Sequence, residues 1–138
     1  MLLVVDVNVI FSALVNKGES FRVFETNFTF KKFEFIFPEF VFLEIGKRMD
    51  KLLLQTRLTK EELSETFSFI KGQIKPISYS DFIDKIPEAL KINLKDSQYL
   101  ALALKFNCGI FSGDKGLKKQ SIVNIYSPRE MLNIIEDN

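Results

Sequence analysis

Short apolar runs alternate with amphipathic segments along the whole chain, a pattern typical of strands and helices that follow one another. Residues 2–5 are apolar at every position, which predicts a buried strand that ends at Asp6. Further strands are expected at residues 34–37, 74–77, 109–111 and 123–126. Helices are expected at residues 8–15, 19–28, 38–54, 60–71 and 97–106. Another helix should begin at Ser80 and break or restart at Pro87, and Ser127 should cap a terminal helix.

This order of elements predicts an α/β fold, because strands separated by helices pair in parallel through right-handed crossovers. We expect a three-layer α/β/α arrangement around a doubly wound parallel sheet with strand order 3-2-1-4-5. Pro76 favours an edge position for the third strand, since proline cannot donate a ladder hydrogen bond. No linker or internal repeat interrupts the sequence, so residues 1–138 are expected to form a single domain.

Composition excludes several kinds of chemistry. The chain has no histidine, which rules out Ser-His-Asp or Cys-His catalysis and histidine-ligated zinc within it. A single cysteine, Cys108, cannot form an internal disulfide, which fits a reducing, cytoplasmic setting. The apolar start lacks the basic lead-in of a signal peptide, and no apolar stretch approaches the ~20 residues of a membrane span. The net charge of +1 neither requires nor excludes nucleic acid.

Four acidic residues stand near the ends of predicted elements that should meet at one edge of the sheet: Asp6, Glu44, Asp96 and Asp114. In a doubly wound sheet, ligands bind beyond the carboxyl ends of the strands, where the strand order reverses. Asp6 follows the first strand and Asp114 follows the fourth, so both should face one crevice. Asp96 begins the helix before the fourth strand, and Glu44 lies in the helix after the second.

Each acid also has a structural interpretation when it is considered alone. Asp6 and Asp96 suit helix N-termini, and Asp114 suits a turn. Glu44 can pair with a basic residue on its own helix. The functional interpretation rests on the set, because two carboxylates about 4 Å apart repel by roughly 4 kcal/mol at an effective dielectric near 20. A carboxylate cluster without imidazole predicts a hard cation, Mg²⁺ or Mn²⁺, and metal-assisted phosphoryl chemistry.

The segments VVDVNVIFSAL, PEFVFLEIGKR, KDSQYLALALKFN and IFSGDKGL occur in this order. Together they resemble the PIN-domain ribonucleases over nearly the whole chain, and most closely the small single-domain prokaryotic proteins that include VapC-like toxins. The resemblance implies that Asp6, Glu44, Asp96 and Asp114 are catalytic and bind one or two metal ions. It further implies that Asn8 and Ser112 orient a water molecule or a carboxylate. Glu39, a rival to Glu44, is interpreted as structural.

The resemblance implies a Mg²⁺- or Mn²⁺-dependent endoribonuclease, with an antitoxin protein as a partner if it is the toxin of a VapBC-type pair. A PIN nuclease of RNA processing outside such pairs and a non-catalytic interaction module remain open as alternatives. A receiver-like phosphoryl-transfer domain fits less well, because the acids are dispersed and the late strands contain no lysine. Candidate RNA contacts are Lys17, Lys47, Arg48, Lys51, Lys115, Lys118 and Lys119.

Phenylalanine is unusually frequent, with 15 in the chain and many between residues 21 and 42. Most are expected to pack in the core, with a base-stacking surface as the alternative. The region nevertheless contains more large apolar side chains than two helices and a short strand readily bury. We therefore expect an exposed apolar patch and a homodimer that uses it, as the family resemblance also suggests.

Overall fold

One parallel sheet of five strands organises the protein, which is described here from a computed structural model that covers residues 1–137. Its strands are β1 (Leu2–Val5), β2 (Glu34–Pro38), β3 (Ile74–Ile77), β4 (Gly109–Phe111) and β5 (Ile125–Tyr126). Their order in the sheet is β3-β2-β1-β4-β5, and every pair is parallel. The predicted fold class and strand order are confirmed, and Pro76 lies in an edge strand as its missing N–H requires.

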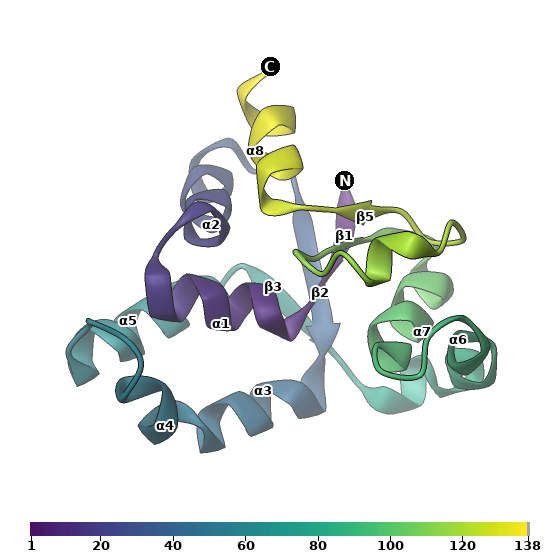
Figure 1. Ribbon diagram of the computed structural model, residues 1–138, viewed down its shortest axis with the longest axis horizontal. Helices are drawn as coiled ribbons and strands as arrows, with labels where there is room; N and C mark the ends of the chain where they lie inside the picture. The colour runs from purple at the N-terminus through teal and green to yellow at the C-terminus, as the bar shows by residue number, and fades with distance from the viewer. Residues whose placement is uncertain (138) are drawn as a thin grey trace.

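Helices cover both faces of this sheet and give the three layers (Figure 1). The helices are α1 (Val7–Asn16), α2 (Glu19–Phe30), α3 (Glu39–Lys47), α4 (Met49–Leu53), α5 (Lys60–Lys71), α6 (Ile86–Ile92), α7 (Ser97–Phe106) and α8 (Pro128–Glu136). Short 3₁₀ turns span Tyr79–Asp81, Ile83–Lys85 and Leu117–Lys119.

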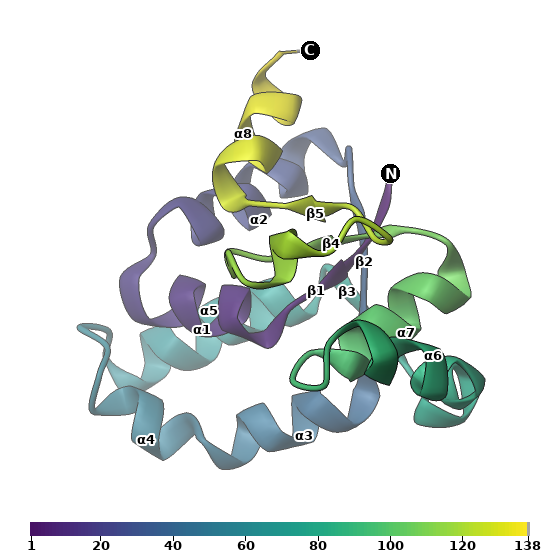
Figure 2. The same ribbon diagram turned by 45° about the vertical axis from the view of Figure 1, so that its right-hand side comes forward.

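The two helical layers follow from the direction in which the chain moves across the sheet. From β1 to β3 it steps in one direction, and it then returns past β1 to reach β4. Right-handed crossovers in opposite directions place their helices on opposite faces. Accordingly, α7 packs against β1, β2 and β4 with α6 outside it, while α1, α2 and α8 pack together on the other side (Figures 1 and 2).

The helix predicted for residues 38–54 is divided in the structure. Pro38 closes β2 and precedes α3 as its N-cap, so it is not the first helical residue that the sequence predicted. The helix then breaks at Arg48, whose backbone angles (φ −99°, ψ 2°) leave the helical region and separate α3 from α4. Gly46, a weak helix former, lies just before this break.

Two other predicted elements are shorter than expected. Residues 79–85 form 3₁₀ turns, and the helix begins only at Ile86. Pro87 lies in the first turn of this helix, where its nitrogen needs no hydrogen-bond partner.

The last strand begins at residue 125 because the Gln120 side chain bonds the backbone of Val123 at both its N–H (2.9 Å) and its carbonyl (2.7 Å). Capping boxes are present at Thr59 and at the predicted Ser127 cap.

The core contains most of the phenylalanines, as expected. Phe24 of α2 contacts Phe35 of β2 and Phe111 of β4, with ring centroids 5.3 and 5.8 Å apart. These contacts join a helix to two strands that are not neighbours in the sheet. Phe28, Phe30 and Phe106 are exceptions, with 58%, 67% and 39% of their surface exposed.

Candidate active site

Asp6 lies at the carboxyl end of β1, where the sheet meets the start of α1. It is fully buried, and its backbone N–H bonds the Phe111 carbonyl of β4 at 3.0 Å. Its side chain caps α1, because Oδ1 accepts the backbone N–H of Asn8 at 3.1 Å. The same carboxylate therefore both begins a helix and lies at the switch point of the sheet.

Ser112 connects this carboxylate to the loop after β4. Its hydroxyl donates to Asp6 Oδ2 at 2.7 Å and accepts the backbone N–H of Asp114 at 3.0 Å. Asp114 Oδ1 in turn accepts the N–H of Gly116 at 2.8 Å, so the loop is held in a turn. This chain of hydrogen bonds fixes the half-buried Asp114 beside the buried Asp6.

Asp96 enters from the opposite face of the sheet, as the N-cap residue of α7. Only 4% of its surface is exposed, and Asn93 Oδ1 accepts its backbone N–H at 3.2 Å. Within residues 1–137, Asp96 Oδ2 is a buried oxygen without a hydrogen-bond partner. Because buried polar atoms are nearly always paired, this carboxylate oxygen is free to accept a hydrogen bond or to bind a cation.

The three aspartates lie close enough to act on one another electrostatically. Burial raises the pKa of Asp96 above its usual value, and repulsion from Asp6 and then Asp114 raises it further. Burial also raises the pKa of Asp6, although hydrogen bonds from Ser112 and the Asn8 backbone oppose this change. The charge of Asp114 also raises the pKa of Asp6. The protein thus gathers carboxylates at the expense of their ionised forms.

A PIN domain family model matches residues 4–131, which span this whole arrangement. The chain belongs to the PIN domain family. PIN domains have a nuclease-type fold, and PIN nucleases generally use divalent metal ions. No curated protein matches the chain significantly. Across residues 1–137, no helix of this PIN domain is both long and apolar enough to cross a membrane.

The structure places Glu44 differently from the three aspartates. Its side chain is exposed on α3, and it is not among the charges that shift the pKa of Asp6 or Asp96. Asn8 contributes its backbone N–H to Asp6, while its residue surface is exposed. The metal-binding role of Glu44 and a role for the Asn8 side chain stay predictions. Glu39 is exposed in the first turn of α3, where a negative charge complements the helix dipole.

The donor chemistry of the site fits a hard divalent cation. The three aspartates offer oxygen ligands alone, and the orphaned Asp96 Oδ2 is available to one. In the part of the chain that the structure describes, however, no three acidic or cysteine side chains are already grouped as a metal site. Asp6, Asp96 and Asp114 are the residues that would hold such an ion, and Asp114 also contacts Lys95.

The sequence did not single out Lys95, Asn93 or Tyr99, which surround the acids. Lys95 Nζ lies 3.8 Å from Asp114 Oδ2. The Tyr99 ring is buried and stacks on Phe37, and burial followed by the charge of Asp6 raises the pKa of its hydroxyl. Their sequence spacing could have indicated that Asn93 and Tyr99 lie near Asp96. Each is three residues from Asp96, which places Asn93 in the preceding turn and Tyr99 on the same helix face.

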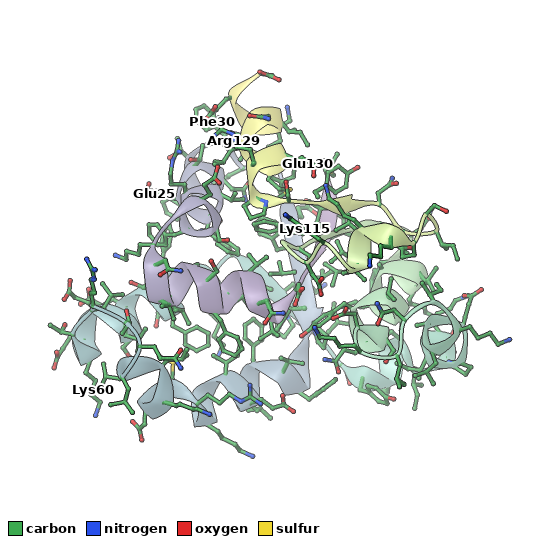
Figure 3. The ribbon with its side chains drawn as sticks, in the orientation of Figure 1. Glu25, Phe30, Lys60, Lys115, Arg129 and Glu130 are labelled. Atoms are coloured by element: carbon green, nitrogen blue, oxygen red, sulfur yellow. The ribbon has the colours of Figure 1, made fainter. Side chains whose placement is uncertain are left out.

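The basic residues predicted to contact RNA are exposed, which permits that role without testing it: Lys17, Lys47, Arg48, Lys51, Lys115, Lys118 and Lys119. Arg48 and Lys51 line a groove of about 230 Å³ beside Phe11 of α1. Lys118 is paired with Glu130 of α8. Figure 3 shows Lys115, in the loop after β4, and Glu130 on the side of the molecule where this loop meets α8.

Proposed function

We propose that this PIN domain is a metal-dependent endoribonuclease that hydrolyses phosphodiester bonds of RNA. The observation that carries the proposal is the orphaned, buried Oδ2 of Asp96 beside the charges of Asp6 and Asp114. A protein that needed only a stable fold would have little reason to bury these carboxylates together. The charge of Asp114 raises the pKa of Asp6, and the charges of Asp6 and Asp114 raise the pKa of Asp96.

Asp6, Asp96 and Asp114 are the residues that would bind Mg²⁺ or Mn²⁺, with Glu44 as the fourth predicted ligand. The bound ion would lower the pKa of a water molecule and stabilise negative charge on the phosphate. Ser112 and the Asn8 N–H hold both oxygens of Asp6 in fixed directions, which pre-orients this ligand. Asn93 accepts the backbone N–H of Asp96 and so helps to hold this residue at the start of α7.

A cleavage assay with single-stranded RNA tests this function. The wild-type chain should cut the RNA with Mn²⁺ or Mg²⁺ and should stop when EDTA is added. Asp6→Asn and Asp96→Asn should each abolish cleavage, whereas Asp84→Asn should retain it, because Asp84 is an exposed acid paired with Lys105. Cleavage by Asp96→Asn at the wild-type rate would refute the assigned site. Parallel reactions with single-stranded DNA test the preference for RNA.

The same protein can serve as the toxin of a VapBC-type pair, with an antitoxin partner, or act in RNA processing. Induced expression in a bacterial host separates these roles. A toxin should arrest growth in the wild-type form, and Asp96→Asn should not, because it lacks the proposed ligand. If the wild-type protein cleaves RNA in the assay but its expression does not slow growth of the host, a role in RNA processing is favoured over a toxin role.

A further inference from the structure

Lys95 is a cation placed beside the three aspartates of the site. Its Nζ lies 3.8 Å from Asp114 Oδ2, at the outer limit of an ion pair. The Lys95 side chain is 76% exposed, whereas that of Asp114 is 23% exposed. The ammonium group therefore reaches Asp114 from the solvent side.

The charge of Lys95 acts on the whole cluster and not on Asp114 alone. Lys95 directly precedes Asp96 in the chain, and its Nζ reaches Asp114, which Ser112 holds beside Asp6. A single flexible side chain thus supplies positive charge to three carboxylates that come from three separate segments. This is the electrostatic task that a divalent cation would perform more strongly.

Stability gives little reason for this arrangement. An ion pair with a largely exposed lysine contributes about 0–1 kcal/mol, because solvent screens it and the side chain loses entropy. The contact is easily exchanged, since the lysine ammonium is a compact charge on a flexible stem. A metal ion bound to the same carboxylates would repel Lys95, and its Nζ would then be free to contact another group.

We propose that Lys95 acts as a counter-charge for the aspartates in the metal-free protein and binds a phosphate oxygen of the RNA once a metal ion has taken its place. This inference rests on the proposed nuclease function and assigns a substrate-binding residue to it. The released ammonium can interact with the phosphate group that the metal ion attracts. Lys95 then favours RNA binding and disfavours metal binding, so its removal should change the two affinities in opposite directions.

Three variants test the inference: Lys95→Met, which removes the charge and keeps an unbranched side chain; Lys95→Arg, which keeps the charge; and Lys91→Met, a control for net charge. Lys91 is an exposed lysine on α6. Mn²⁺ affinity is measured from the rise of Tm with metal concentration. RNA affinity is measured by fluorescence anisotropy of a labelled single-stranded RNA with Ca²⁺ present, with the intact RNA verified on a gel.

Lys95→Met should bind Mn²⁺ about 2- to 5-fold more tightly, the change that corresponds to a surface ion pair. It should bind RNA several-fold more weakly, Lys95→Arg should restore both affinities, and Lys91→Met should change neither. The inference is overturned if Lys95→Met moves both affinities in the same direction, leaves either unchanged, or matches Lys91→Met. Failure of the nuclease proposal is distinguishable, because the wild type would then lack Mn²⁺-dependent RNA cleavage.

Discussion

Ser112 Oγ donates a hydrogen bond of 2.7 Å to Asp6 Oδ2 although 106 residues separate the two in sequence. The register of the sheet explains their proximity. Val5 of β1 pairs with Phe111 of β4, and Asp6 and Ser112 are the next residues of these neighbouring strands. The contact is buried at the point where the strand order reverses, so the topology of the sheet builds one side of the site.

Replacing Ser112 with alanine should weaken both the site and the fold. Asp6 would lose a hydrogen bond that favours its ionised form, so the pKa of Asp6 should rise further. Leaving this buried oxygen unpaired should lower the free energy of unfolding by about 1–3 kcal/mol. Urea unfolding at neutral pH measures the loss. Ser112→Thr keeps the hydroxyl and should stay close to the wild type; equal losses in both variants would contradict a hydrogen-bonding role.

Asp96→Asn should stabilise the metal-free protein at neutral pH. The pKa of Asp96 is raised in the folded state, so the folded protein binds this proton more readily than the unfolded chain, and ionisation costs stability. The free energy of unfolding should therefore fall as pH rises from the ordinary value of 3.8 through the raised pKa. Thermal melts in EDTA should show a higher Tm for Asp96→Asn at neutral pH, with the difference vanishing in acid.

Asp84 supplies a control of opposite sign for that experiment. Its hydrogen bond with Lys105 lowers the pKa of the Asp84 carboxyl, so its contribution to stability is present above the ordinary pKa and is lost as pH falls. Asp84→Asn should therefore lower Tm slightly at neutral pH, since the group is exposed. An increase in Tm with both variants would mean that net charge, and not the local environment of Asp96, decides the result.

Mn²⁺ should raise the Tm of the wild-type protein, because a ligand that binds only the folded state stabilises it. Saturating metal at 100 times Kd would contribute about 2.7 kcal/mol. EDTA should reverse the shift, and Asp96→Asn should reduce it strongly by removing a charged ligand. A shift of the same size in Asp96→Asn and the wild type would place the metal elsewhere on the protein.

The apolar surface at the end of α2 should support a homodimer. Phe28 and Phe30 are exposed there, at the edge of the sheet opposite the acids, and Phe28 borders a groove of about 630 Å³ that a second copy can fill. Figure 3 labels Phe30 at this end of α2. Light scattering at micromolar concentration should give a dimer for the wild type and a monomer for Phe30→Ser. Leu54→Ser, at a residue with 87% of its surface exposed, should remain dimeric; a monomeric wild type would exclude this assembly.

Gly109 should tolerate no larger residue. A Cβ atom at this position would lie 2.8 Å from the Asn124 carbonyl oxygen and 2.8 Å from Tyr126 Cε2. Gly109→Ala should destabilise the protein by about 1–3 kcal/mol through overpacking, measured by urea unfolding. Gly46→Ala is the control, since a Cβ there meets nothing within 4 Å and alanine is a better helix former within α3. Equal effects of the two substitutions would contradict the steric explanation.

Local patterns in the sequence determined most elements of this PIN domain. The apolar run before Asp6 and the capping boxes at Thr59 and Ser127 act within a few residues, so they predict a strand end and two helix starts without reference to the rest of the chain. The alternation of strands and helices predicted the parallel fold, because strands separated by helices pair in parallel through crossovers. The family motifs identified Asp6, Glu44, Asp96 and Asp114 as a set. In the structure the charges of Asp6 and Asp114 act on Asp96, whereas Glu44 is exposed on α3 and is not among these charges.

Only the tertiary structure decided how the side chains are arranged around that set. The helix break at Arg48 and the exposure of Glu44 depend on how α3 and α4 pack, and Gln120 shortens β5 through a contact that no strand pattern contains. Lys95 looked like an ordinary surface lysine, because its relation to Asp114 depends on two loops that meet across the end of the sheet. Periodicity specifies which face of an element is buried, whereas contacts between distant segments depend on packing and cannot be derived from spacing.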